Sequence, residues 1–337
     1  MTKVNRLALS MLVVLSLAAF AAAQSYTITD LGQFNVFAIN SLGDVTINNP
    51  TYANSFVLSP GGGLLHLAPL PGGCCTSPLG INRQGLAVGQ SDNSSLVYSA
   101  VLWTNGEPLD LGILPGGTSS WATAINASGE VVGWSFIPTG VEAFLWTKAT
   151  GMQGLGFLPG AAVSIAKAIN RFGQVAGFSG ANIDIDAGKD SAFIWSKTTG
   201  MTSLEKLPGY DSSGASAIND LGQVAGESAC ISCRLYSHAT LWSKAKGSML
   251  DLGVLPGFME STATAINNVG QVVGSSSNGN PHAFVWSPST GMLDLNNLIQ
   301  ANSGWALAAA NAINDQGQIV GFGLHNGQGV GFLLTPQ

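Results

Sequence analysis

Short apolar segments alternate with turn residues along most of this chain, and the alternation recurs at a regular interval. The stretch AINNVGQVVG, from Ala265 to Gly274, occurs seven times in variant form. Its asparagine is found at intervals of 42, 44, 44, 49, 48 and 47 residues, at Asn40, Asn82, Asn126, Asn170, Asn219, Asn267 and Asn314. A period in the forties with strand-like segments is typical of repeat architectures, so the repeat is the first guide to the fold.

One repeat holds four strand-like segments separated by turns. Around Asn267 we expect strands over 263–266, 271–274, 283–286 and 292–295. Asn267 and Gly270 stand at the first and fourth positions of the turn between the first two strands, as is typical of a type I turn. Short strands at regular spacing with turns between them favour an all-β sandwich, barrel or propeller.

Side-chain size increases along each repeat. The first strand is rich in alanine, the second carries glycine, and the third carries Phe, Leu and Trp, including Trp103, Trp146, Trp195, Trp242 and Trp286. In a ring of wedge-shaped sheets, small residues inside and large ones outside fill the wedge at interior density. This favours a propeller over a sandwich, with the tryptophans packed between blades. A solenoid of stacked coils is the alternative, although its usual period is shorter.

The two ends of the repeat region are complementary. The segment Thr27–Gly32 resembles a fourth strand, and the chain finishes with a third-type strand, Gly331–Leu334. The first could complete the last repeat and leave no long unpaired edge. We therefore predict a seven-bladed β-propeller of four-stranded antiparallel blades over residues 25–337, read as a single domain because single repeats cannot bury a core alone.

The first residues resemble an export signal. Lys3 and Arg6 precede an apolar segment that ends at Phe20, and three alanines follow, so residues 1–23 are expected to be a signal peptide cleaved after Ala23. An uncleaved anchor is the alternative. The protein is expected outside the cytoplasm, either extracellular or periplasmic. No later segment is long enough and apolar enough to predict a membrane span.

The charge of the chain excludes one class of partner. Without residues 1–23 the chain has ten basic and eighteen acidic residues, a net charge of −8. Nucleic acid is therefore not an expected partner, because phosphate binding needs a basic surface. Only 9 % of residues are charged, against about 25 % in ordinary globular domains. Strands covered on both faces by neighbouring blades account for this low share, and we expect a monomer.

The repeat resembles a known family. Pro281-His282-Ala283-Phe284-Val285-Trp286, followed by Gly291-Met292 and Asp294-Leu295, is similar to the HAF repeat of probable extracellular bacterial proteins. The resemblance covers Tyr26 to Leu334 and implies export and a repeat fold, without an established activity. Among the seven repeats His282 keeps the full His-Ala-Phe triplet, while His238 precedes Ala-Thr. The strand order is also similar to that of tryptophan-aspartate repeat propellers, which are mostly interaction platforms.

Candidate binding residues lie where the repeats differ. The seven asparagines, and the aspartates Asp30, Asp110, Asp251 and Asp294, follow the repeat and are interpreted as turn residues. Aromatic residues outside the repeat pattern are expected at the rim that carries the variable loops, and they suit stacking on a sugar or peptide. These candidate ligand-binding residues are Trp121, Trp134, Tyr210, Tyr236, Phe258 and Trp305. The alternative is that they anchor the loops.

Two further patterns carry chemistry. Asn182, Asp184, Asp186 and Asp190 alternate along one loop and could supply oxygen ligands to calcium, although Gly188 stands one place late for the usual calcium loop and no helices flank it. A solvated acidic loop is the alternative, and no other cofactor is expected.

Cys230 and Cys233 are expected to form a disulfide. Cys74 and Cys75 are adjacent, so a bridge between them would be strained, and the two pairs lie too far apart in sequence for a four-cysteine zinc site.

Signatures of catalysis are sparse. No nucleophile elbow, zinc-protease motif or phosphate loop is present. Carboxylates outside the repeat pattern could form an acid–base pair across the rim, but nothing in the sequence pairs any two of them: Asp92, Glu142, Asp184, Asp211, Glu227 and Glu260. The sequence therefore favours an exported, non-catalytic binding or scaffold propeller for a glycan, peptide or envelope component. The alternatives are a hydrolase or lyase of extracellular polysaccharide, and a structural envelope component.

Overall fold

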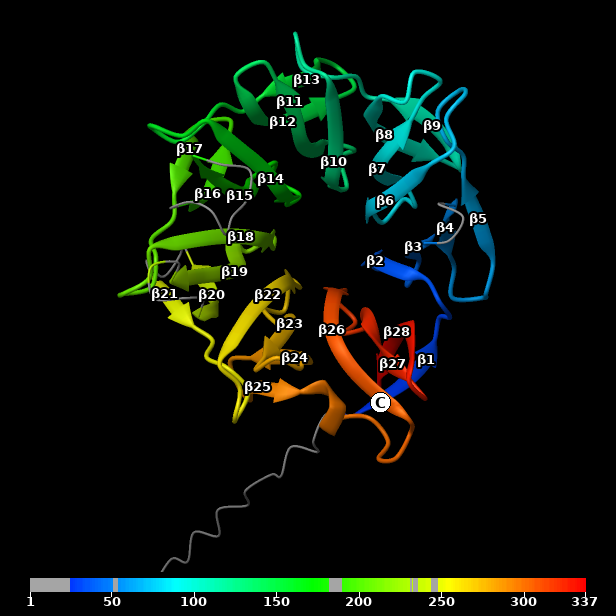
Figure 1. The fold of residues 1–337 in the computed structure, drawn as a ribbon, viewed down its shortest axis with the longest axis vertical. Helices are drawn as coiled ribbons and strands as arrows, with labels where there is room; N and C mark the ends of the chain where they lie inside the picture. The colour runs from blue at the N-terminus through cyan, green and yellow to red at the C-terminus, as the bar shows by residue number, and fades with distance from the viewer. Residues whose placement is uncertain (1–24, 51–53, 182–189, 231, 233–235, 244–247) are drawn as a thin grey trace, which may run out of the picture.

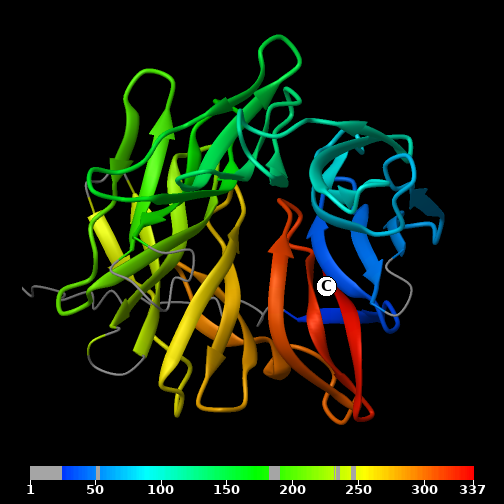
Figure 2. The same cartoon turned by 45° about the horizontal axis from the view of Figure 1, so that its top comes forward.

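The computed structural model describes residues 25–50, 54–181, 190–230, 232, 236–243 and 248–337. The proposed signal peptide, residues 1–23, lies outside the described residues. The described part is an all-β, propeller-like fold in which the sheets stand side by side around a central axis (Figures 1 and 2). The prediction of an all-β propeller-like fold is therefore confirmed. Among the described residues, no helix has the length and apolar character needed to cross a membrane.

The described strands form five sheets of four strands and one of eight. We number the repeats as units 1 to 7 in the order of their asparagines. Unit 1 contains β2 (Asn35–Ile39), β3 (Val45–Asn49), β4 (Asn54–Leu58) and β5 (Leu64–Leu67). Unit 2 contains β6 (Thr76–Ile81), β7 (Ala87–Asp92), β8 (Tyr98–Thr104) and β9 (Glu107–Asp110). The eight-stranded sheet contains unit 3, with β10 (Ser119–Ile125), β11 (Val131–Ile137), β12 (Gly140–Thr147) and β13 (Gly151–Gly154), and unit 4, with β14 (Val163–Ile169), β15 (Val175–Gly180), β16 (Ser191–Ser196) and β17 (Gly200–Ser203).

The remaining units follow the same order. Unit 5 contains β18 (Ser212–Ile218), β19 (Gln223–Cys230), β20 (Tyr236–Ser243) and β21 (Ser248–Asp251). Unit 6 contains β22 (Glu260–Ile266), β23 (Val272–Ser277), β24 (His282–Ser287) and β25 (Gly291–Asp294), followed by the 3-10 helix η2 (Leu295–Asn297). Unit 7 contains β26 (Trp305–Ile313), β27 (Ile319–His325) and β28 (Gln328–Pro336), and its sheet is completed by β1 (Tyr26–Asp30).

The two ends of the described chain meet in one sheet. β1 pairs antiparallel with β28, from Tyr26 opposite Pro336 to Asp30 opposite Phe332. The closure predicted from the two ends is thus present. The eight-stranded sheet owes its size to a single parallel pair, Val141 opposite Val163, which joins β12 to β14.

The repeat asparagines link neighbouring units as well as forming turns. The Asn126 Oδ1 accepts hydrogen bonds from the N–H groups of Ser128 and Glu130, both at 3.0 Å. Its Nδ2 donates to the main-chain oxygen of Asn170 in the next unit at 3.1 Å. The same bond passes from every repeat asparagine to the next, and Asn314 returns it to the oxygen of Asn40 at 3.0 Å. The turn role predicted for these residues is confirmed, and a closed ring of side-chain bonds is added to it.

Each inner strand, which we define as the first strand of a unit, carries a β-bulge three residues before its asparagine. In β14 the register shifts between Ala166 and Ala168, so that Lys167 is the extra residue. The partner strand has a glycine opposite the bulge in six units, and a Cβ at Gly177 would overlap the main-chain oxygen of Ile165. Bulged residues from five units line one cavity on the axis: Leu79, Thr123, Lys167, Ser216 and Thr264. The bulge therefore turns one side chain per unit toward the axis.

The hydrophobic core lies between neighbouring units. The Phe144 ring is fully buried and packs with Ala122 and Val131 of its own unit and with Val88 and Leu102 of the preceding one. Trp103, Trp146, Trp242 and Trp286 are buried in such clusters, and Trp195 packs against one. The packing role predicted for the third-strand tryptophans is therefore confirmed.

Candidate functional site

The two ends of the axis differ in chemistry. At one end, the asparagine turns line a shallow cavity together with the isoleucine that precedes each asparagine. The amide groups there are used in the ring described above. Two arginines also line the cavity, Arg83 and Arg171, and the Arg171 Nε lies 3.7 Å from a carboxylate oxygen of Asp220. The inner strands begin at the opposite end, which we call the open end. Most residues that depart from the repeat pattern lie at the open end or partway down the channel from it.

Two predicted aromatic residues form a stacked pair at the open end. Trp121 on β10 lies opposite Trp134 on β11, with ring centroids 4.2 Å apart and planes 13° apart. Tyr98, at the start of β8 in the preceding unit, extends the stack at 6.2 Å from Trp121. The tryptophans were expected in loops but lie within strands, where the register of the pair holds both rings. Tyr98 was not among the candidate residues predicted from the sequence, because it lies next to the third-strand positions that every repeat shares.

The other predicted aromatic residues fall into two groups. Tyr210, Phe258 and Trp305 each contact a histidine, with centroid distances of 5.7, 4.9 and 4.5 Å to His238, His282 and His325. A histidine ring thus covers part of each face that was expected to stack on a ligand. Tyr236, at the start of β20, is 41 % exposed. Among the described residues, no ring contact joins any of these four residues to the Trp121–Trp134 stack.

Each of these histidines also contacts an aspartate. The Nδ1 atoms of His238, His282 and His325 lie 2.9, 2.7 and 2.7 Å from carboxylate oxygens of Asp251, Asp294 and Asp30. The same aspartates accept the N–H two residues further on, as Asp251 does from Gly253 at 2.8 Å. Partial burial alone would raise the pKa of Asp30, but the hydrogen bonds from His325 and the Gly32 N–H hold it below its ordinary value.

In unit 3, a glutamate takes the place of the histidine–aspartate pair and shows that the carboxylate caps the turn after the fourth strand. Glu142 stands at the histidine position and Gly154 at the aspartate position. The Glu142 carboxylate fills the space beside Gly154 and accepts the Gly156 N–H at 3.0 Å. The turn is thus still capped by a carboxylate although the histidine is absent. We conclude that the pairs stabilise the end of the fourth strand, which agrees with the turn role predicted for the repeat aspartates.

A positively charged side chain, that of Lys167, lines the axial cavity. The cavity has a volume of about 280 Å³ and is lined by the bulged residues, among which Lys167 is the one charged side chain. Its Nζ lies 5.9 Å from the ring centroid of Phe178. The Lys167 side chain is exposed to the solvent of this cavity, yet the surrounding ring of strands removes part of its solvation and lowers its pKa. Among the described residues no carboxylate forms an ion pair with it.

A carboxylate lies beside open space in the unit next to Lys167. Glu227 on β19 stands opposite Gly214 on β18, and its Oε2 accepts a hydrogen bond from the Thr262 hydroxyl at 2.7 Å. A Cβ built at Gly214 would have no atom within 4 Å. Gly214, Trp121 and Thr262 each stand five residues before a repeat asparagine, two residues nearer the open end than the bulged positions. Because Gly214 has no side chain, there is open space at this position of β18, the inner strand that neighbours β14 with Lys167.

Asp190 is a buried carboxylate at the start of the third strand of unit 4. The residue is fully buried, and within the part of the chain that the structure describes neither carboxylate oxygen has a hydrogen-bond partner. Burial raises the pKa of Asp190 to about 6, although the charge of Lys206 acts in the opposite direction. The other candidate calcium ligands, Asn182, Asp184 and Asp186, lie outside the described residues. The calcium site stays a prediction from the sequence.

The cysteines separate into two pairs. Cys230 is disulfide-bonded, while its predicted partner Cys233 lies outside the described residues. Cys74 and Cys75 are free, and their sulfur atoms lie close to the carboxylate of Asp92. From the sequence, Asp92 could be recognised only as a carboxylate outside the repeat pattern. Its proximity to Cys74 and Cys75 could not be predicted, because they lie on separate segments of unit 2.

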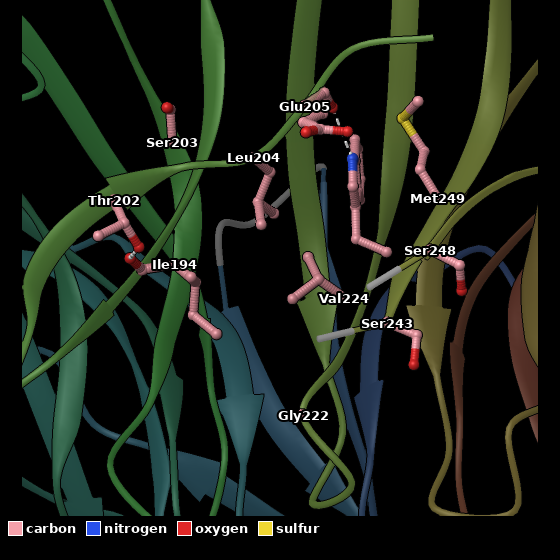
Figure 3. A pocket seen from close by; sticks show the side chains of 11 residues that line it. Ile194, Thr202, Ser203, Leu204, Glu205, Gly222, Val224, Ser243, Ser248 and Met249 are labelled. Carbon is pink, nitrogen blue, oxygen red and sulfur yellow. Dashed lines mark hydrogen bonds between the residues drawn. The ribbon is translucent and has the colours of Figure 1, made fainter. Parts of the chain in front are cut away.

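An apolar groove lies on the outer side of units 4 and 5. Leu204, Val224 and Met249 line it, and the Trp242 Nε1 donates to the Glu205 main-chain oxygen at 2.7 Å (Figure 3). Among the described residues, Glu205 is the one ionisable residue of its lining. The described lining therefore offers no pair of groups for acid–base chemistry, and we do not place the active site there.

No protein-family model matches the chain, and no curated protein is significantly similar to it. Its fold is similar to that of virginiamycin B lyase from Staphylococcus aureus, with a TM-score of 0.54 and 10 % identity over 92 % of this chain and 99 % of that chain. A catalytically inactive histidine-to-alanine variant of that lyase, solved with quinupristin, gives a TM-score of 0.51 at 10 % identity over 92 % and 99 %.

Two further lyases share the fold. A streptogramin B lyase gives a TM-score of 0.55 at 9 % identity, covering 93 % of this chain and 98 % of that chain. An oligogalacturonate lyase in complex with manganese gives 0.55 at 11 % identity, again covering 93 % and 98 %. At this identity the likeness shows the fold alone. The prediction of a non-catalytic binding module is nevertheless corrected, because these propellers are enzymes, in agreement with the alternative of a lyase or hydrolase.

Proposed function

We propose that this chain is a lyase that cleaves an acidic polysaccharide by β-elimination in its axial cavity, which the sugar enters from the open end. One observation carries the proposal: Lys167, a lysine without an ion-pair partner among the described residues, lines the channel and has a lowered pKa. A lysine whose pKa lies closer to the working pH has a larger neutral fraction, and neutral amine is the form that accepts a proton.

The chemistry of β-elimination fits these residues. The Lys167 Nζ takes the proton from the sugar carbon next to the carboxylate. The electron pair of that C–H bond forms the new C=C bond, the C–O bond to the next sugar breaks, and the departing oxygen takes a proton from water. Before the reaction, the protonated fraction of Lys167 attracts an anionic sugar into a chain whose net charge is −6.

The surroundings supply places for the sugar chain. The space beside Gly214 opens a route toward Lys167, and Glu227 and Thr262 border it with hydrogen-bonding groups. The Trp121–Trp134 stack, with Tyr98, offers aromatic surface at the same end. A cavity of about 280 Å³ lies just below the usual range for ligand pockets, which suits one sugar ring held inside while the rest of the polymer remains outside.

The comparison enzymes support this reaction class without fixing the residues. Virginiamycin B lyase loses its activity when a histidine is replaced. Here His238, His282 and His325 are each held by an aspartate and an aromatic ring. The fourth histidine, His66, lies on the outer strand β5 against Phe56, away from the axis, so we assign the base to Lys167. The manganese of oligogalacturonate lyase is not transferred. The one group of three metal-type ligands among the described residues contains two thiols, which are softer than manganese prefers.

We further propose that the ring has seven blades. The halves of the eight-stranded sheet are joined by one residue pair, so each half counts as a blade of four strands. The asparagine bonds that pass through all seven units and return to Asn40 support this count. In keeping with the expected signal peptide and the HAF resemblance, we place the enzyme outside the cytoplasm, as a monomer.

The test is an activity screen on acidic polysaccharides, which follows the ultraviolet absorbance of the unsaturated product. Lys167→Met is expected to lower kcat about 100-fold or more, since a general base contributes about 10²–10⁴-fold. Gly214→Leu should block the channel while the protein stays folded, because nothing fills the space beside Gly214. Lys148→Met, at an exposed hairpin residue, is the matched control and should keep wild-type activity. Unchanged turnover in Lys167→Met, or no activity on any acidic polymer, would overturn the proposal.

A further inference from the structure

The loop that enters unit 2 wraps around the end of the second strand of that unit. Asp92, the last residue of β7, is 2 % exposed. Its Oδ1 accepts hydrogen bonds from the N–H groups of Cys74 and Cys75 at 2.9 and 2.8 Å. Its Oδ2 lies 3.4 Å from the Cys74 Sγ, and the two sulfur atoms lie 2.7 Å apart. Two thiols and a carboxylate oxygen therefore converge on one point.

The backbone is shaped to bring these groups together. Gly72 has a φ of +77°, and a Cβ at Gly73 would stand 2.6 Å from the Asp92 Oδ1. The loop can approach the Asp92 carboxylate this closely only because residues 72 and 73 are glycines. Unit 3 has the same Pro-Gly-Gly loop but places Thr118, Ser119 and Phe136 at the corresponding positions. The loop shape thus belongs to the repeat, whereas the thiol–carboxylate set does not recur in unit 3.

We propose that Cys74, Cys75 and Asp92 bind a thiophilic divalent cation, with Zn²⁺ as the reference ion. Zinc takes cysteine sulfur and aspartate oxygen in tetrahedral geometry, and three protein ligands leave a fourth position for water. Calcium and magnesium are disfavoured by two thiols, since they select oxygen ligands. Zn–S bonds of about 2.3 Å require the sulfur atoms to move apart, which the exposed Cys74 side chain can do by rotation.

The carboxylate is already oriented for this role. Two main-chain N–H groups hold the Asp92 Oδ1 and leave Oδ2 directed at the sulfur atoms, as second-shell hydrogen bonds orient metal ligands elsewhere. A disulfide is the competing state of two adjacent thiols. It is disfavoured because neighbouring Cα atoms are about 3.8 Å apart, below the usual disulfide range of about 4.4–6.8 Å.

The site borders the surface assigned above to the polysaccharide. Tyr98 pairs with Asp92 across β7 and β8, and its ring continues the stack on Trp121. The inference does not depend on the lyase proposal, because its test measures metal binding directly.

The experiment is calorimetric titration of the full chain with ZnCl₂ after mild reduction with a reagent that does not bind metal. A count of two thiols beforehand shows that Cys74 and Cys75 are reduced while the disulfide of Cys230 is intact. One equivalent of zinc is expected to bind, and Co²⁺ should give the absorbance of thiolate coordination. Cys74→Ser and Cys75→Ser should abolish both signals. Asp92→Asn keeps an oxygen for the two N–H groups but removes the charge, and should weaken binding at least about tenfold.

The matched control is the equivalent loop of unit 3, where Thr118→Ala and Ser119→Ala should leave zinc binding unchanged. Thermal melts without metal check that each variant is folded, and Cys74→Ser, at an exposed side chain, is the variant least expected to disturb the fold. Absence of binding to the reduced wild type would overturn the inference. So would zinc binding that survives both serine substitutions, or a mass two hydrogens lower that shows a Cys74–Cys75 disulfide persisting under the reductant.

Discussion

The buried carboxylate of Asp190 should make the stability of this protein fall as the pH rises through the weakly acidic range. Asp190 is fully buried with both oxygens unpartnered, and its pKa is raised from 3.8 to about 6. The folded protein therefore holds a proton that the unfolded chain releases at lower pH. Below about pH 4 both states are protonated, and above about pH 6 both are ionised, so the effect develops between these values.

The magnitude follows from the difference between the two pKa values. A separation of about two units at about 1.4 kcal/mol per unit gives about 3 kcal/mol. Between pH 3 and pH 7 the folded state should lose that amount of stability through Asp190 alone. In Asp190→Asn this titration is absent. The buried amide of the variant adds a cost for unpaired donors that does not depend on pH. The informative quantity is therefore how the difference in free energy of unfolding between variant and wild type changes with pH, and not its absolute value.

The assay is urea unfolding of wild type and Asp190→Asn at pH 3, 4, 5, 6 and 7. The free energy of unfolding of the variant minus that of wild type should rise by about 3 kcal/mol across this range, with its midpoint between the two pKa values. Asp190→Ser should show the same change with a different constant offset. A difference that stays flat with pH would refute the burial argument, and a difference that falls would mean that a cation holds the ionised form.

Two stability predictions concern the repeat itself. Asn126→Ala removes the bonds to the Ser128 N–H and to the next unit and should lower the free energy of unfolding by about 3 kcal/mol. Ser128→Ala, at an exposed side chain of the same turn, should have no measurable effect, and equal losses in the two would contradict the ring. Gly177→Ala forces a Cβ into a main-chain oxygen and should cost about 2 kcal/mol or more, whereas Gly214→Ala, with open space beside it, should stay within about 1 kcal/mol. Urea unfolding measures both pairs, and a Gly214→Ala loss as large as that of Gly177→Ala would show that the bulge is not the cause.

The repeat allowed much of the fold to be predicted because its signals are local. The Asn–Gly turn, the alternation within strands and the size gradient each depend on a few neighbouring residues. The closure by β1 could also be predicted, since a fourth-type strand at one end and a third-type strand at the other complement each other. The bond from each Asn side chain to the next unit could not, because it joins main-chain oxygens more than forty residues away.

The candidate site was harder to predict because it depends on register. The bulge decides that Lys167 faces the axis, and no residue pattern in β14 announces it. Trp121 and Trp134 were recognised as unusual, but their pairing follows from the register of β10 with β11. Tyr210 shows the opposite failure: it was outside the repeat pattern, yet its ring contacts His238.

The departures from the repeat are unevenly distributed around the axis, and this bears on where a substrate would lie. Units 5 to 7 carry histidine–aspartate pairs that cap their fourth strands, so much of their polar chemistry serves the fold. Units 2 to 5 carry the thiol–carboxylate set, the stacked tryptophans, Lys167 and Glu227, and none of these is needed by the repeat. In a ring of nearly equivalent units, a residue that breaks the pattern without stabilising its own unit needs another explanation. We propose ligand contact as that explanation, with a bound polymer lying across units 2 to 5, over the cavity that Lys167 lines.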